Sequence, residues 1–215
     1  MGRFLEACCT SASAAAQAER GGASRIELCE QLAIGGVTPS RALIEDTLNS
    51  CMRAKVNVLV RPRGGNFVFS EEEVQSMLDD IRMCREEGVN GVVIGALRED
   101  GSVDMETMKR LISAARPLSV TFHRAFDECC DVVKCLEDII SLGCERLLTS
   151  GHEADAFTGR FTIAGLVKQA AGRIIIMAGC GVRAHNIAEL EAATGAPEFH
   201  SSCWADMSEL VNNSL

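Results

Sequence analysis

The sequence predicts a closed (β/α)8 barrel of the TIM type with a short or missing final helix. Eight short β-rich runs alternate with helical patterns along the 215 residues, which is typical of a parallel sheet. The first turn lacks a G-x-G-x-x-G pattern, and polar residues follow many of the runs. A barrel builds its site from nearly every strand end, whereas the alternative, a doubly wound open sheet, uses one crevice. We expect one domain over residues 1–215.

The expected strands are short runs rich in β-branched and other apolar residues. Because side chains alternate between the two faces of a strand, residues two apart at a strand end point the same way. The eight runs are 4–8, 25–29, 56–61, 91–94, 119–123, 146–149, 174–177 and 198–201.

The intervening segments follow the helical period of 3.6 residues. Ser70 with Glu73 forms a capping-box pattern, and Asp104 and Asp131 are expected to begin two further helices. After the eighth strand, residues 207–213 allow two helical turns at most, so we expect a poorly covered seam between the last and first strands. Exposed apolar surface there would favour a homo-oligomer. Glycines are expected to end several helices, at Gly88, Gly143 and Gly172.

Composition narrows the classes of function. Hydrophobic residues make up 47% of the chain, enough for a full core, and the formal net charge is −9. Such an acidic chain is not expected to bind nucleic acid or anionic membranes. The sequence shows neither a signal peptide nor an apolar run of membrane-spanning length, so we expect a soluble, cytoplasmic protein, with the nucleus as an alternative compartment.

The eleven cysteines include no CxxC pair, and their number is odd. Without a secretory signal we expect free thiols that pack as small hydrophobes, not a disulfide framework. Cys8 and Cys29 differ because each closes a Glu-x-Cys motif, with Glu6 and Glu27. If the two strands are neighbours, two carboxylates and two thiols meet at one end of the sheet.

Two other strand ends carry polar residues. Arg61 and Arg63 flank a proline before two glycines, and arginine forks bind carboxylate or phosphate. The alternative is that these arginines pair with the two glutamates inside the barrel. His123 is followed by Arg124 at the end of the fifth strand. Its position favours a role as general acid or base over a purely structural hydrogen bond.

In these motifs the chain resembles the CutC family, in order and over nearly its whole length. The resemblance implies a cytosolic, commonly oligomeric TIM-type barrel named for copper homeostasis, with Cys8 and Cys29 at its proposed Cu(I) ligands. The chain departs from the family pattern at Asn66, Ala178, Cys180, Ser201 and Cys203. The matching motifs are RIELC (25–29), GVTPS (36–40), RPRGG (61–65), GAL (95–97) with EDG (99–101), TFHRAFD (121–127), LTSG (148–151) and EFH (198–200).

Two functions therefore stand. The first is Cu(I) binding or trafficking, in which copper is held by the soft thiolates of Cys8 and Cys29. The second is a lyase, isomerase or hydrolase that acts on a small anionic metabolite, and the sequence does not choose between these reactions. In that enzyme Glu6, Glu27 and His123 are the candidate catalytic residues. The candidate substrate-binding residues are Arg61, Arg63, Arg124 and His200.

Overall fold

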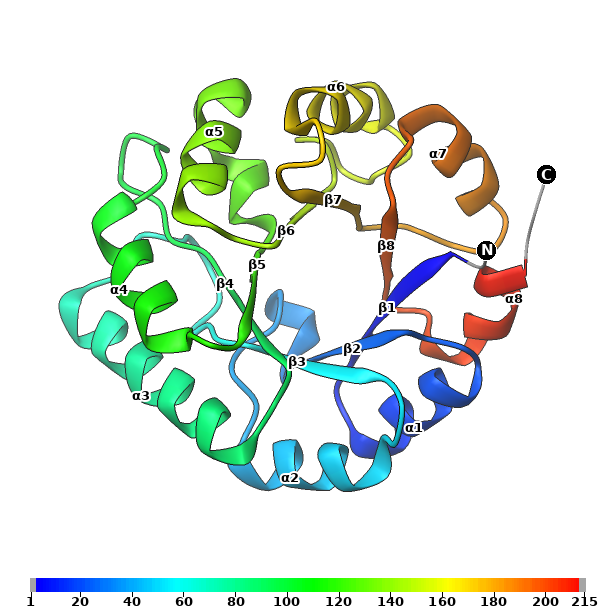
Figure 1. The fold of residues 1–215 in the computed structure, drawn as a ribbon, viewed down its shortest axis with the longest axis horizontal. Helices are drawn as coiled ribbons and strands as arrows, with labels where there is room; N and C mark the ends of the chain where they lie inside the picture. Colours follow the sequence, from blue (N-terminus) through cyan, green and yellow to red (C-terminus); the bar gives the residue numbers. More distant parts are fainter. Residues whose placement is uncertain (1–2, 213–215) are drawn as a thin grey trace.

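The computed structural model describes residues 3–212. Eight parallel strands pair in chain order, and β8 pairs with β1 to close the barrel (Figure 1). This confirms the (β/α)8 barrel and excludes the open sheet. The strands are β1 (Phe4–Cys9), β2 (Arg25–Leu28), β3 (Lys55–Leu59), β4 (Gly91–Ile94), β5 (Ser119–Phe122), β6 (Arg146–Thr149), β7 (Ile175–Ala178) and β8 (Glu198–Ser201).

The α-helices surround the strands as an outer layer (Figure 1). Three 3-10 helices, η1 (Leu32–Ile34), η2 (Arg124–Glu128) and η3 (Trp204–Asp206), follow β2, β5 and β8. No helix within residues 3–212 is both long and apolar enough to cross a membrane. The α-helices are α1 (Ala12–Arg20), α2 (Arg41–Ser50), α3 (Glu71–Glu87), α4 (Met105–Ala115), α5 (Val132–Leu142), α6 (Arg160–Ala170), α7 (Ile187–Thr194) and α8 (Met207–Asn212).

Helix ends follow the expected capping chemistry with one exception. Ser70 accepts a hydrogen bond from the backbone of Glu73, and the Glu73 carboxylate bonds back to Ser70, which confirms the capping box. Gly88 and Gly143 end α3 and α5 in the left-handed conformation, as expected. At α6 the left-handed cap is Ala171, at φ 47°, and the expected glycine follows it.

The final helix is short, as predicted, but it covers the seam better than expected. Met207 and Leu210 of α8 are buried, and the backbone at Gly21, after α1, passes close to Met207. The expected apolar opening between β8 and β1 is therefore not what the structure shows. The large apolar side chains that are exposed among the described residues lie elsewhere, at Leu32, Ile34, Met52, Val133 and Phe161. A homo-oligomer stays a prediction.

Strand register sets which side chains meet inside the barrel. Cys8 is the Cα partner of Glu27 across β1 and β2, and Glu6 is the partner of His200 across β1 and β8. Since alternate residues of each strand face inward, the Glu-x-Cys motifs project into the barrel next to the end of β8. Apolar side chains fill most of the space between strands and helices. The polar interior therefore lies within the ring of strands.

Candidate functional site

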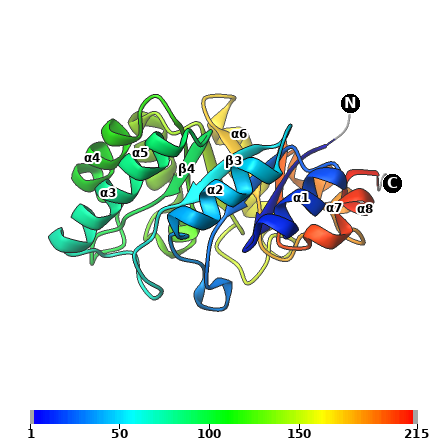
Figure 2. The same ribbon diagram turned by 90° about the horizontal axis from the view of Figure 1, so that it is seen from below.

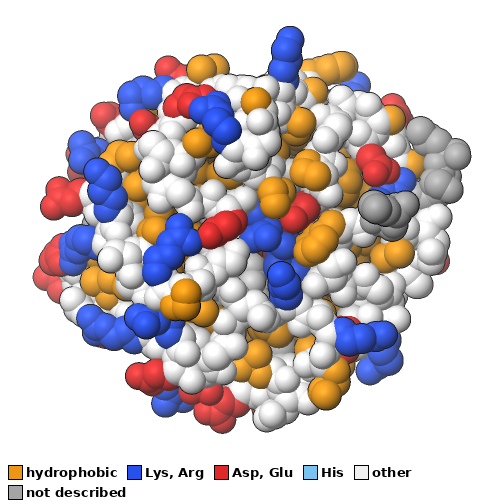
Figure 3. Space-filling model, in the orientation of Figure 1, with side chains coloured by type: hydrophobic (Ala, Val, Ile, Leu, Met, Phe, Trp, Pro, Cys, Tyr) orange, Lys and Arg blue, Asp and Glu red, His pale blue; other side chains and the backbone are white. Residues whose placement is uncertain are grey.

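A cavity of about 640 Å³ opens at the ends of the strands, where the barrel places its loops. Figure 2 shows these loops on the side of the barrel away from the N-terminus. The opposite face, shown in Figure 3, has Lys and Arg side chains gathered near its centre with acidic side chains beside them. Six residues singled out from the sequence line the cavity: Cys8, Glu27, Arg61, His123, Arg124 and His200.

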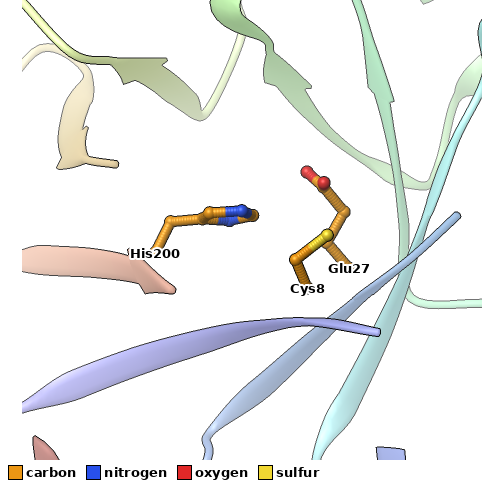
Figure 4. A group of neighbouring side chains, drawn as sticks. All are labelled: Cys8, Glu27 and His200. Carbon is orange, nitrogen blue, oxygen red and sulfur yellow. The ribbon is translucent and has the colours of Figure 1, made fainter. Parts of the chain in front are cut away.

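Three of these side chains converge on one point. The sulfur of Cys8, a carboxylate oxygen of Glu27 and a ring nitrogen of His200 lie within 4.8 Å of one another. Figure 4 shows the three side chains, from β1, β2 and β8, directed toward one another. The cluster offers one sulfur, one oxygen and one nitrogen donor to a metal ion.

The second cysteine lies behind the first. The Sγ atoms of Cys8 and Cys29 are 3.7 Å apart, and Cys29 is fully buried and does not line the cavity. The hydrogen bond with Cys29, burial and the nearby Glu27 raise the pKa of Cys8 well above its ordinary value. In the metal-free protein Cys8 is therefore a neutral thiol, not a nucleophilic thiolate.

Glu27 is a carboxyl group held in a low-dielectric site. Burial raises its pKa to about 7, and the negative charge of Glu6 adds to this, while His200 acts in the opposite direction. Its Oε2 atom has no hydrogen-bond partner among the described residues. Glu27 therefore presents an unsatisfied oxygen to the cavity and changes protonation state near neutral pH.

Glu6 belongs to a closed ionic network beneath the cavity. Its carboxylate binds the guanidinium of Arg25 and accepts a hydrogen bond from His200 Nδ1 at 2.7 Å. Burial alone would raise the pKa of Glu6, but Arg25 and His200 lower it to about 2. Glu198 binds the other side of Arg25 and also Arg146. Glu6 is fully buried and does not line the cavity, and its oxygens are occupied by Arg25 and His200.

His200 is held by this network from below. Because the Glu6 carboxylate only accepts hydrogen bonds, His200 Nδ1 must donate, and its Nε2 is the nitrogen left for a ligand. Burial lowers the pKa of His200, but Glu27 and Glu6 outweigh it and the net shift is upward.

Arg61 and Arg63 lie on the same loop, but their side chains have different partners. Arg61 donates to the carbonyls of Gly36 at 3.3 Å and Gly65 at 2.6 Å, and it is 5% exposed. Arg63 pairs with Glu73 at 2.5 Å and does not line the cavity. Neither arginine pairs with Glu6 or Glu27 within residues 3–212, so that alternative was wrong: β3 ends at Leu59, and both side chains leave with the loop that follows.

His123 caps the 3-10 helix η2. Its Nδ1 accepts from the backbone N–H of Ala125 at 3.2 Å, which places the proton of the neutral ring on Nε2. Burial and the charge of Arg61 lower the pKa of His123 to about 3. Nε2 has no partner in the described part of the chain. His123 is therefore a neutral donor at the cavity wall.

Arg124 lies at the rim, where its Nε binds Asp127 at 2.8 Å and its Nη2 approaches Ser150 Oγ at 3.3 Å. Asp127 also accepts the backbone N–H of Ser150, so it fixes the loop after β6. The sequence did not reveal these contacts of Asp127, nor the roles of Arg25 and Arg146 beneath the cavity. Charged residues at inward-facing strand positions are the signal that would have revealed the latter two.

Fold and site together define a TIM-type barrel protein with a polar cavity, containing thiols, at the mouth of the barrel. The sequence profile of the CutC family matches residues 3–205. The chain belongs to the CutC family.

Relatives and solved structures agree with this assignment. The chain is 54% identical to a CutC family protein of Parabacteroides distasonis over 94% of this chain and 83% of that one. It is 50% identical to one of Xylella fastidiosa, over 92% and 74%. A CutC crystal structure from Streptococcus agalactiae, described as a copper homeostasis protein, superposes with a TM-score of 0.89 at 32% identity, covering 93% of this chain and 98% of that one. An aldolase structure superposes with a TM-score of 0.71 at 14% identity, covering 97% of this chain and 91% of that one. At this identity the two proteins share the fold alone.

Proposed function

We propose that this protein binds one Cu(I) ion at the base of the cavity through Cys8 and Cys29, with His200 as a third ligand. The observation that carries the proposal is the 3.7 Å contact between the two sulfurs, of which that of Cys8 lies within 4.8 Å of a ring nitrogen of His200. Thiolates and imidazole are ligands that suit copper in proteins. The description of the Streptococcus agalactiae relative as a copper homeostasis protein supports the same metal.

The surroundings of His200 support its role as a ligand. Metal-binding histidines commonly donate their second ring N–H to a carboxylate, which fixes the ring and its tautomer. Glu6 accepts from His200 Nδ1 in this way and is itself held by Arg25. Glu6 therefore acts on the metal site through His200, as a positioning residue.

Binding would be coupled to proton release. The pKa of Cys8 lies well above its usual range in the metal-free protein, so the ion must displace a proton from that thiol. We expect the apparent Cu(I) affinity to rise with pH across the neutral range. Protonation also keeps the Cys8 thiol unreactive when no metal is bound.

The test is an anaerobic Cu(I) titration against a competing chelator. Cys8→Ser with Cys29→Ser should weaken binding by about a hundredfold or more, and His200→Gln by about tenfold. Cys144→Ser, which removes a buried thiol far along the chain, just before β6, is the matched control and should bind as wild type does. Unchanged affinity in the double variant would refute the site.

An enzyme is the second candidate, favoured by buried polar atoms that have no partner within residues 3–212. They include Glu27 Oε2 and His123 Nε2, and both residues line the cavity. In such an enzyme Glu27 would transfer a proton and His123 would donate a hydrogen bond to a developing negative oxygen. A screen of small anionic metabolites for turnover tests this, and loss of any turnover found in Glu27→Gln is the expected result.

A further inference from the structure

Arg61 is a buried cation that forms no salt bridge in the part of the chain that the structure describes. Its side chain is 5% exposed, and its Nε has no hydrogen-bond partner there. Its two terminal nitrogens bind neutral carbonyls, those of Gly36 and Gly65. Burial lowers the pKa of Arg61, and the charge of the exposed Glu128, which lines the same cavity, acts in the opposite direction. Arginine remains charged under all ordinary conditions, so this residue cannot relieve its burial by losing a proton.

Burying a charge is costly unless the charge is paired. The barrel meets that requirement for Arg25, which binds both Glu6 and Glu198. For Arg61 the protein supplies carbonyl dipoles and an aromatic face: its Cζ lies 4.5 Å from the ring centroid of Phe67. Because Glu128 and Arg61 form no salt bridge, the guanidinium is left able to bind an anion in the cavity that both residues line.

A second donor lies on the same wall. The rings of Phe67 and His123 are 4.9 Å apart, so Phe67 is in contact with both Arg61 and His123. His123 Nδ1 is occupied by the backbone of Ala125, which leaves an Nε2–H with no partner among the described residues. Two buried donors, one charged and one neutral, therefore lack acceptors on one side of the cavity.

We propose that Arg61 and His123 form a binding subsite for the carboxylate of a small hydroxy acid, whose hydroxyl groups lie toward Glu27. The carboxylate would accept from Arg61 Nε and His123 Nε2, which gives both buried donors a partner. Glu27, which also lines the cavity, supplies an oxygen, Oε2, that lacks a partner among residues 3–212. A hydroxyl group satisfies this oxygen in either protonation state, because a hydroxyl both donates and accepts.

The donor count favours a carboxylate over a phosphate. Phosphate sites in barrels use several backbone N–H groups at a helix N-terminus after the seventh and eighth strands. Here α7 begins at Ile187, well beyond the end of β7, and Cys180 occupies the intervening turn. A carboxylate, with two oxygens and one charge, matches one guanidinium N–H and one imidazole N–H. The cavity, at about 640 Å³, is large enough for an acid of several carbons.

The test uses the intact protein with three probes: glycolate, malate and gluconate. Binding is measured by saturation-transfer NMR and by calorimetry, with sorbitol as the uncharged counterpart of gluconate. We expect at least one acid to bind with a Kd of about 1 mM or tighter and sorbitol not to bind. Arg61→Met and His123→Gln should each weaken the binding of that acid by about tenfold or more, because each removes a buried donor.

Arg63→Met is the matched control, because Arg63 lies on the same loop but pairs with Glu73 outside the cavity. It should bind the acid as wild type does. Thermal melting of each variant establishes that the barrel is folded. Failure of all three acids to bind, or equal binding of the acid by Arg61→Met and wild type, overturns the proposal. Tighter binding of inorganic phosphate than of any acid also overturns it, because the subsite would then recognise phosphate and not a carboxylate.

This subsite is independent of the copper site. Arg61→Met leaves the sulfur atoms of Cys8 and Cys29 and the ring of His200 in place, so Cu(I) titration of that variant should match wild type. Cys29→Ser, in turn, alters a fully buried residue outside the cavity lining and should leave acid binding unchanged. The two proposals therefore fail separately.

Discussion

Two buried arginines in one barrel have opposite surroundings. Arg25, at the start of β2, binds Glu6 and Glu198, and with Arg146 these residues form a closed network. Arg61, just beyond β3, binds two carbonyl groups and no carboxylate among the described residues. The lower interior pairs its carboxylates and guanidinium groups with one another, although Arg25 Nη1 has no hydrogen-bond partner among the described residues, whereas Arg61 at the mouth forms no salt bridge there. Charged groups with a structural role are paired with one another, whereas a ligand-binding site retains donors and acceptors that have no partner in the protein.

The same contrast holds for the two Glu-x-Cys motifs. Glu6 is paired twice and its pKa falls to about 2, whereas burial raises the pKa of Glu27 to about 7. The two motifs are staggered by two residues across β1 and β2, which places Glu6 opposite Arg25 and Glu27 opposite Cys8. Identical motifs thus become a structural carboxylate and a site carboxylate.

The largest effect should come from breaking the closed network. Arg25→Met leaves the fully buried Glu6 without its guanidinium partner, and we expect the free energy of unfolding to fall by about 3–5 kcal/mol. Urea denaturation measures it. Arg110→Gln, which breaks the surface pair with Glu71, is the control and should change stability little. Equal effects of the two substitutions would contradict the contrast between interior and surface charges.

Glu27→Gln should stabilise the protein above neutral pH. The folded-state pKa of about 7 exceeds the ordinary value of 4.5, so the folded state binds more protons between these values and wild-type stability falls as pH rises through them. At pH 8 the variant should be more stable by about 3 kcal/mol, an advantage that disappears below about pH 4.5. Urea titrations across this range measure it. An advantage independent of pH would mean that Glu27 ionises normally.

His123 should make the protein sensitive to acid. Its folded-state pKa of about 3 lies below the ordinary 6.5, so the unfolded state binds more protons between these values and stability falls as pH decreases. Between pH 6 and 4.5 wild type should lose about 2 kcal/mol more stability than His123→Gln. Parallel stability curves for the two proteins would show that His123 keeps its ordinary pKa in the folded state.

Arg61→Met should have the smallest effect on stability, within about 1 kcal/mol of wild type. The substitution removes two hydrogen bonds to carbonyls but also removes a buried charge that forms no salt bridge in the described chain. Urea denaturation beside Arg25→Met makes the comparison direct. A loss as large as that of Arg25→Met would mean that the carbonyls of Gly36 and Gly65 fully compensate Arg61 within the protein itself.

The barrel was predictable because its signals are local. Eight apolar runs, the capping box at Ser70 and the glycines after α3 and α5 act within a few residues of chain. Strand ends shifted where a neighbouring segment intervened: the carbonyl of Arg61 binds the backbone of Thr38, so the chain leaves the sheet before that residue. Such a contact between segments far apart in the sequence has no local signature.

The sequence by itself determined the alternation of strands and helices and the chemistry gathered at the strand ends. It also placed Cys8, Glu27, Arg61, His123 and His200 among the candidates. Only the tertiary structure decided which of the candidate residues open into the cavity and which, like Glu6, Cys29 and Arg63, find their partners elsewhere. The physical reason is that pairing between charges depends on distances across the barrel, which strand register and closure fix and residue types alone do not.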